Sequence, residues 1–159
     1  MKSKHVVVIS VLIGSLLFPL SLGAAVAGSP GAPDAIPEQE VRQFIDRYVD
    51  RYKAMDIDLF MELFSRKGVE NRMLPYADIR TTYHKMFTGS NQFLYYLTIY
   101  SVQTQARSAF VTGRYTLIQT LRRGNRMRIF RGNIQWGLVK EEGSLKIREI
   151  NFGRSRADD

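Results

Sequence analysis

Cysteine is absent from the 159-residue chain, and histidine occurs only at His5 and His84. Without a thiol the chain forms no disulfide, holds no zinc–thiolate or iron–sulfur centre and has no cysteine nucleophile. Two imidazoles are too few for a multi-histidine metal site. The sequence therefore predicts no metal site and no cofactor. The chain is 45% hydrophobic and 11% aromatic, which argues against disorder and indicates one folded domain.

Charged residues are also absent between residues 6 and 23. Two lysines precede this apolar run and Ala25-Val26-Ala27 follows it, which is the order of regions in a secretory signal peptide. We expect residues 1–27 to direct export and to be removed, leaving a periplasmic or extracellular protein. The alternative is a permanent membrane anchor formed by the apolar run. Residues 28–36, rich in glycine and proline, predict a flexible linker.

Apolar residues recur at helical spacing after Pro37 and predict a first helix. The face expected to be buried comprises Val41, Phe44, Ile45, Tyr48, Val49, Tyr52 and Met55. Asp56 is a candidate N-cap for a short second helix whose apolar residues extend to Phe64. Residues 78–87 show the same spacing and predict a third helix.

From residue 93 the pattern changes to an alternation of apolar and polar residues that is typical of β-strands. The strands predicted in this way cover residues 93–103, 109–117, 130–138 and 145–152. Gly124-Asn125 and Glu142-Gly143 are predicted turns between them. Three helices followed by an antiparallel meander predict an α+β domain over residues 37–153, with a polar tail at 154–159.

Basic residues are concentrated in the second half of the chain, and four arginines flank the first of these turns. They are Arg122, Arg123, Arg126 and Arg128. Guanidinium groups gathered at a hairpin tip suit phosphates or carboxylates. In an exported protein this indicates an anionic component of the cell envelope as partner, and not nucleic acid. The alternative is a solubilising cluster that protects the sheet edge.

The order of helix, short helix, helix and long hairpins resembles the nuclear transport factor 2-like superfamily, which includes SnoaL-like proteins and ketosteroid isomerases. The similar segments are Arg47-Tyr48-Val49, Met55-Asp56-Ile57-Asp58, Leu63-Phe64 and the closing hairpin over residues 138–147. The resemblance covers residues 37–152. It implies a cone-shaped fold in which three N-terminal helices pack on a curved antiparallel sheet of four or more strands and enclose a pocket.

The resemblance also implies a homodimer that forms sheet to sheet. Four apolar side chains alternate with polar residues on the predicted outer face of the sheet, and we call them the outer stripe: Tyr96, Tyr100, Phe110 and Ile118. An apolar sheet face of this kind is typical of a protein interface. We therefore expect the outer stripe to be the dimer contact.

Aromatic side chains with a polar tip suit a pocket wall, because the ring packs while the tip meets a ligand. The candidates that we expect to line the pocket are Tyr48, Tyr52, Tyr83, Tyr95, Tyr115 and Trp136. The alternative is that all six belong to the core, with their polar tips bound to the backbone or to water.

The resemblance allows a test for isomerase chemistry, which needs a tyrosine, a proton-carrying carboxylate and a second acid. The tyrosine maps onto Tyr48, but the carboxylate position falls at Asn71 and the second acid near Ile134. An amide cannot carry the proton, and an isoleucine offers no donor. A shift of one residue would instead place Glu70 in the pocket.

Two further acid–base candidates remain. Dehydratase-like members of the superfamily use a histidine–aspartate pair, and His84 could pair with Asp56 or Asp78. Glu149 alternates with inward residues of the last strand and would face the pocket unless a bulge turns it outward.

We therefore expect an exported, non-enzymatic SnoaL-like domain that binds a small apolar or amphipathic ligand or an envelope partner. One alternative is a small cofactor-independent isomerase, dehydratase or hydrolase that uses the pocket around Tyr48. A structural dimerisation module without a ligand is the other alternative.

Overall fold

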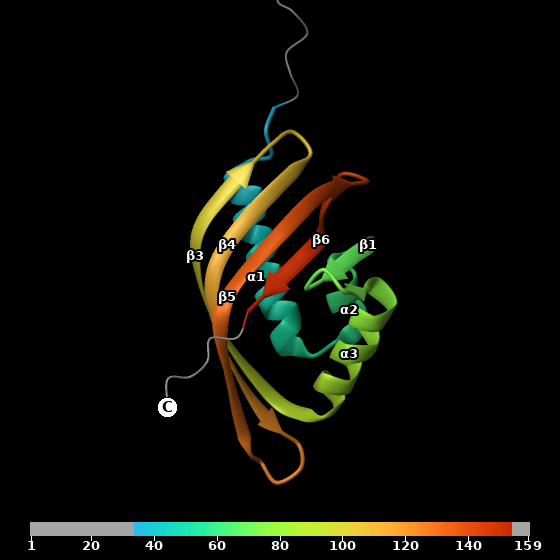
Figure 1. Ribbon diagram of the computed structural model, residues 1–159, viewed down its shortest axis with the longest axis vertical. Coiled ribbons are helices and arrows are strands. Elements are labelled where there is room, and N and C mark those ends of the chain that lie inside the picture. Colours follow the sequence, from blue (N-terminus) through green and yellow to red (C-terminus); the bar gives the residue numbers. More distant parts are fainter. Residues whose placement is uncertain (1–33, 154–159) are drawn as a thin grey trace, which may run out of the picture. The chain divides into compact units, whose positions relative to one another are not determined.

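The computed structural model describes residues 34–153 (Figure 1). The expected signal peptide, the first six residues of the expected linker and the polar tail lie outside the described residues. The last linker residue, Ile36, is packed into the core, and its backbone N–H donates to the carbonyl of Gln105 at 3.0 Å. The packed part of the chain therefore begins at least one residue before the expected boundary at 37.

Helix α1, Glu38–Ala54, follows Pro37 and carries acidic residues in its first turn and basic residues in its last. This distribution of charge complements the helix dipole. The predicted helix is confirmed, and five residues of its predicted face are buried: Val41, Phe44, Ile45, Tyr48 and Tyr52. Met55 ends the helix in the left-handed conformation, with φ 56°. No helix among residues 34–153 is long and apolar enough to span a bilayer.

Two strands separate the second helix from the third, so the helices do not follow one another directly. Asp56 caps α2, Ile57–Met61, by accepting hydrogen bonds from the N–H groups of Asp58 and Leu59, but the helix has only five residues. The chain then forms β1, Phe64–Glu70, and β2, Leu74–Pro75, before α3, Tyr76–Thr88. Phe64, expected in the short helix, begins a strand because β1 pairs in parallel with the last strand of the chain.

The sheet has six strands in the order β2-β1-β6-β5-β4-β3. Its larger part is the predicted antiparallel meander, which comprises β3 (Ser90–Thr104), β4 (Ser108–Leu121), β5 (Met127–Glu141) and β6 (Ser144–Phe152). Figure 1 shows the helices gathered on one side of this curved, open sheet. The α+β fold class is confirmed.

The core lies between the helices and the concave face of the sheet. Trp136 of β5 is fully buried, and its ring lies edge-on to that of Tyr48 at a centroid distance of 5.7 Å. The opposite face exposes much of the outer stripe, since Tyr96, Tyr100 and Phe110 are 58%, 61% and 41% exposed. The homodimer through this stripe stays a prediction.

Strand β3 lies at the edge of the sheet, and its pairing with β4 is irregular near the middle. Ile99 pairs with Gly113, whereas Ser101 pairs with Thr112, so Tyr100 is an extra residue in β3. A bulge of this kind bends the strand and increases its local twist. At this bend the backbones of β3 and β4 approach so closely that a Cβ on Gly113 would lie 2.6 Å from the carbonyl oxygen of Thr98.

We therefore predict that Gly113→Ala lowers the free energy of unfolding by about 1–3 kcal/mol, because the added methyl group must push two paired backbones apart. The matched control is Gly137→Ala in β5, where the new Cβ would meet the Glu149 Cβ at an ordinary 3.5 Å. The control should change stability by less than about 1 kcal/mol. Urea unfolding measures both, and equal effects would contradict the close-approach explanation.

Candidate functional site

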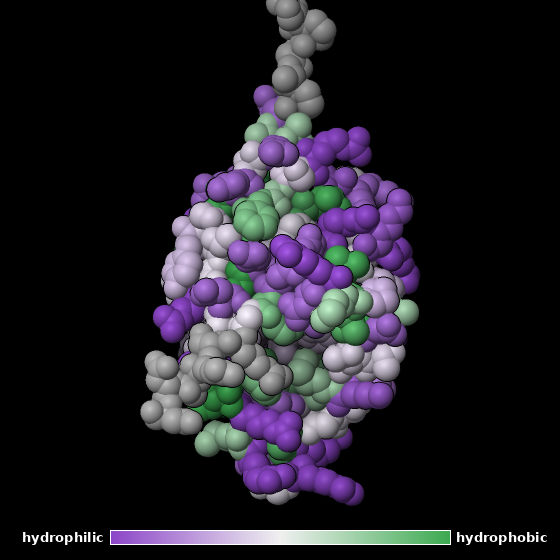
Figure 2. All heavy atoms as spheres, viewed as in Figure 1, coloured by the Kyte–Doolittle hydropathy of each residue, from purple (hydrophilic) through white to green (hydrophobic). Residues whose placement is uncertain are grey.

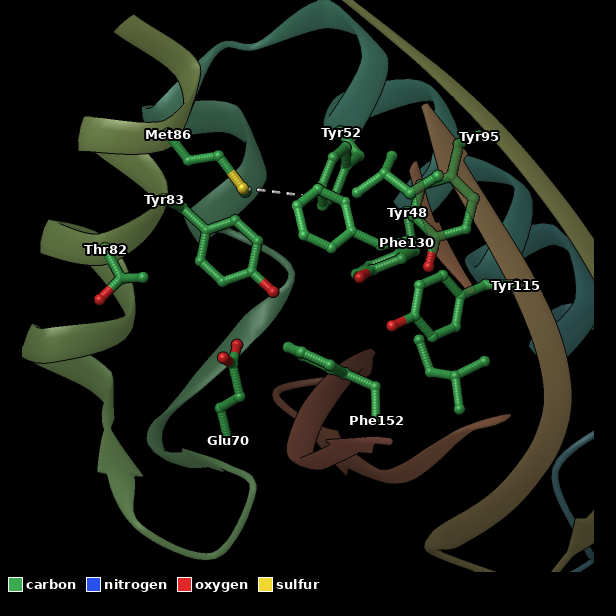
Figure 3. Close-up of a pocket in the computed structure, with 12 residues that line it drawn as sticks. Tyr48, Tyr52, Glu70, Thr82, Tyr83, Met86, Tyr95, Tyr115, Phe130 and Phe152 are labelled. Carbon is green, nitrogen blue, oxygen red and sulfur yellow. Dashed lines mark hydrogen bonds between the residues drawn. The ribbon is translucent and has the colours of Figure 1, made fainter. Parts of the chain in front are cut away.

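A cavity of about 230 Å³ lies among α1, α3 and the concave face of the sheet (Figure 3). Its walls are almost entirely apolar and aromatic. The twelve lining residues are Tyr48, Tyr52, Glu70, Thr82, Tyr83, Met86, Tyr95, Tyr115, Leu117, Phe130, Ile134 and Phe152. A concave apolar site with few polar groups is the usual form of a small-molecule site.

Five of the six aromatic residues expected at the pocket lie in this wall, while Trp136 does not. Trp136 lies behind Tyr48 in the core, and its indole Nε1 is buried without a hydrogen-bond partner among residues 34–153. It alternates with Ile134 on the concave face of β5, but its ring is fully buried against Tyr48 of α1. Two aromatic lining residues, Phe130 and Phe152, were not among the pocket candidates.

Five of the lining rings form a continuous arc, the aromatic arc: Tyr83, Tyr52, Tyr95, Tyr115 and Phe152. Successive ring centroids lie 5.8, 5.2, 6.2 and 6.2 Å apart, with interplanar angles of 87°, 71°, 37° and 78°. Three of the four angles are steep, and steep angles at these distances are the geometry that the quadrupoles of aromatic rings favour. The rings come from α3, α1, β3, β4 and β6, so the arc exists only in the folded chain.

Glu70, at the end of β1, contributes the carboxylate of this cavity. It is only 6% exposed, and its Oε2 has no hydrogen-bond partner among the described residues. Burial raises the pKa of the Glu70 carboxyl, and the smaller effect of a hydrogen bond from the Tyr83 hydroxyl lowers it. Figure 3 shows the carboxylate directed toward that hydroxyl.

Glu70 occupies the cavity because the following turn holds Asn71 elsewhere. Asn71 has a positive φ of 50°, and its side-chain Oδ1 accepts a hydrogen bond of 2.9 Å from the backbone N–H of Phe152. This bond turns the Asn71 amide to the backbone of β6. The structure therefore matches the alternative of a one-residue shift, while Ile134 lines the cavity as an apolar residue.

The cavity tyrosines are donors, since burial raises the pKa of Tyr48, Tyr52 and Tyr83 well above the usual value for tyrosine. Burial also raises the pKa of Tyr95. Neighbouring tyrosines raise the pKa values of Tyr48, Tyr52 and Tyr83 further, and Glu70 does so for Tyr52 and Tyr83. For Tyr95, a hydrogen bond with Tyr48 lowers the pKa and so opposes the effect of burial. All four side chains are therefore neutral at physiological pH. Tyr52 directs its hydroxyl at the sulfur of Met86, 3.5 Å away, which is a weak acceptor.

The two other acid–base candidates lie away from the cavity. His84 is exposed on α3, and its expected partner Asp56 uses its carboxylate to cap α2. Glu149 lies on the outer face, because Gly137 pairs with Glu149 while Leu138 pairs with Ile147, which leaves one extra residue in β6. This bulge reverses the alternation that would have turned the carboxylate inward. Within residues 34–153 no group of three or more Asp, Glu or His is placed to hold a metal ion.

The hairpin arginines are all exposed, and Figure 2 shows hydrophilic side chains gathered around this tip of the β4–β5 hairpin. Arg122 has a structural contact: its backbone N–H and its guanidinium donate to the carbonyls of Gly89 and Ser90, at 2.9 and 3.4 Å. These carbonyls follow the end of α3. Arg123, Arg126 and Arg128 form no ion pair with any residue between 34 and 153.

No protein-family model matches the chain, and no curated protein matches its sequence. Similar structures identify the fold. A nuclear transport factor 2-like superfamily protein from Salmonella enterica is 14% identical over 77% of this chain and 93% of its own, with a TM-score of 0.66. A ketosteroid isomerase-like protein from Erwinia carotovora atroseptica is 17% identical over 75% and 96%, with a TM-score of 0.64. The fold expected from the sequence, that of the nuclear transport factor 2-like superfamily, is confirmed.

The buried carboxyl makes stability depend on pH. Because the pKa of Glu70 is raised in the folded chain, the folded chain keeps a proton on this carboxyl at pH values where the unfolded chain has released it. The free energy of unfolding of the wild type therefore falls as the pH rises above about 4.3, the pKa in the unfolded chain, and stops falling once the pH exceeds the pKa in the folded chain. Gln has no such transition. We predict that the free energy of unfolding of Glu70→Gln rises relative to that of the wild type between about pH 4 and pH 7.

Urea unfolding of both proteins across this range measures the difference. The matched control is Glu149→Gln, since Glu149 lies partly exposed on the outer face of the sheet. A difference between wild type and Glu70→Gln that stays constant with pH would show that the Glu70 carboxyl does not titrate differently in the folded chain.

Proposed function

We propose that this domain binds a small amphipathic molecule in the aromatic cavity. The observation that carries the proposal is the unpaired oxygen of Glu70 in an otherwise apolar wall. An apolar body would fill the space among the rings, and one polar group would satisfy the carboxyl. Since a water molecule takes up about 30 Å³, the cavity has room for roughly eight non-hydrogen atoms.

The setting of this function is also a proposal. The uncharged run after the N-terminal lysines supports export, and the exposed arginines at the β4–β5 hairpin support contact with an anionic envelope component. The exposed outer stripe supports a homodimer. Intact-mass measurement of the exported chain and light scattering on the purified domain test export and dimerisation.

Blocking the cavity mouth should weaken binding without unfolding the chain. Thr82 of α3 is exposed and lines the cavity, so Thr82→Trp places a large ring at the entrance. With 4-methylphenol as probe, we expect a dissociation constant of the order of 1 mM for wild type, about 4 kcal/mol of binding free energy. For Thr82→Trp the constant should be at least about tenfold weaker, a loss of about 1.4 kcal/mol.

The matched control is the neighbouring Thr81→Trp, whose side chain is exposed and directed away, with its hydroxyl donating to the carbonyl of Ala77. Titration followed by NMR gives the three constants, and thermal unfolding checks that all three proteins are folded. If Thr82→Trp binds the phenol as well as Thr81→Trp does, the ligand does not enter through this mouth.

A second candidate is a proton-transfer enzyme, and the observation that favours it is a carboxyl of raised pKa beside neutral tyrosine hydroxyls. A buried carboxylate is a competent base for a carbon acid, and a tyrosine hydroxyl can donate to the oxyanion that forms. Glu70 would remove and return a proton next to a carbonyl group, and Tyr83 or Tyr48 would bind the carbonyl oxygen. The chain would then act on small ketones.

Deuterium incorporation into cyclohexanone in D₂O, followed by NMR, measures this activity. We expect Glu70→Gln to reduce the catalysed exchange by about 10²–10⁴-fold, the usual contribution of a general base. Glu149→Gln should leave it unchanged, because Glu149 lies on the opposite face of the sheet. If deuterium exchange in the presence of the wild type is no faster than in buffer alone, the proposal of a proton-transfer enzyme is contradicted.

A further inference from the structure

The aromatic arc and the Glu70 carboxylate together surround one space. The arc begins at Tyr83 and ends at Phe152. Glu70 lies between these two ends (Figure 3). The carboxylate is directed toward the Tyr83 hydroxyl, and β1 runs beside β6, with Glu70 opposite Ile150, two residues before Phe152. The hydrogen bond from the Phe152 N–H to the Asn71 side chain holds the residue after Glu70 against the end of the arc.

Charge in this space has one sign. Of the twelve residues that line the cavity, Glu70 is the one with a carboxylate, and none is a lysine, arginine or histidine. The chain as a whole is basic, with a formal net charge of +8. The carboxylate is therefore a local feature of the cavity, separate from the charge of the surface around it.

A neutral ligand would leave the charge of Glu70 uncompensated and would make no cation–π contact with the aromatic rings. The faces of aromatic rings carry negative charge in their quadrupole and attract cations, most strongly where water is excluded. A buried carboxylate that lacks an opposite charge is unfavourable even where one of its oxygens accepts a hydrogen bond, and a cation removes that penalty. An organic anion would meet the like charge of Glu70 and seven aromatic rings, with no side-chain donors in the lining other than the hydroxyls of the tyrosines and Thr82.

We propose that the ligand of this cavity carries a small organic ammonium group, which sits within the aromatic arc with Glu70 as its counter-ion. This inference rests on the proposed binding function and names its ligand class. The ring faces bind the alkyl groups on nitrogen, and the carboxylate supplies the compensating charge. The volume fits a cation of the size of choline, which has seven non-hydrogen atoms, against a capacity of roughly eight.

The test compares choline with 3,3-dimethyl-1-butanol, a neutral molecule of the same shape in which carbon replaces the quaternary nitrogen. NMR titration of the whole domain measures both constants, with 4-methylphenol as a third probe. We expect choline to bind wild type at least tenfold more tightly than the alcohol. In Glu70→Gln the advantage of choline should fall below about threefold, while the constant for the alcohol stays the same or improves.

A second variant examines the rings. Phe152→Leu keeps an apolar side chain at the end of the arc and removes one aromatic face, so it should weaken choline several-fold and the alcohol less. Thermal unfolding of both variants confirms that they are folded. If Phe152→Leu weakens the binding of choline and of the alcohol equally, the Phe152 ring contributes only packing, and its proposed contact with a cation is contradicted.

The outcomes separate the two proposals. If the alcohol or 4-methylphenol binds wild type as tightly as choline or more tightly, the inference of a cation is overturned and the binding function stands. If choline still binds Glu70→Gln at least tenfold more tightly than the alcohol does, the role of Glu70 as counter-ion is overturned. If none of the three probes binds to the cavity, the proposed binding function fails, and the inference fails with it.

Discussion

The packing of α1 into the concave face of the sheet is the contact on which the rest of this structure depends. Tyr48 lies at its centre, with ring contacts to Phe60, Tyr95 and Trp136 at centroid distances of 5.5, 6.0 and 5.7 Å. One helix residue thus joins α1 to α2, β3 and β5. Tyr52, one turn later, also lines the cavity, so the same helix face supplies the core and the wall of the site.

The cavity combines a rigid wall with one unfavourable polar group. Steeply angled rings drawn from five separate elements have little room to rearrange, because each ring is held by its neighbours as in any close-packed interior. Glu70 lies in this wall at the end of a strand that is fixed by pairing on both sides. A buried carboxyl in such a place lowers the stability of the empty domain, which is a common property of sites that bind or react.

Local patterns in the sequence were sufficient for α1, α3, the antiparallel meander and five of the cavity tyrosines, because each depends on helical or alternating periodicity. They were insufficient for β1, whose parallel partner β6 lies about eighty residues later in the chain. The inward position of Glu70 depends on the turn at Asn71, and the outward position of Glu149 depends on a bulge in β6. Both are backbone irregularities, and a single residue of shift reverses the face of a strand.

The bulge at Tyr100 also bears on how copies of the domain can meet. Within the part of the chain that the structure describes, the fifteen-residue strand β3 pairs with another strand on one side only. A long regular edge of this kind can template the addition of strands from other molecules. The extra residue interrupts the even spacing of the free N–H and C=O groups near the middle of the strand. The bulge therefore disfavours edge-to-edge aggregation into extended sheets, and it would leave the face of the sheet for the proposed homodimer.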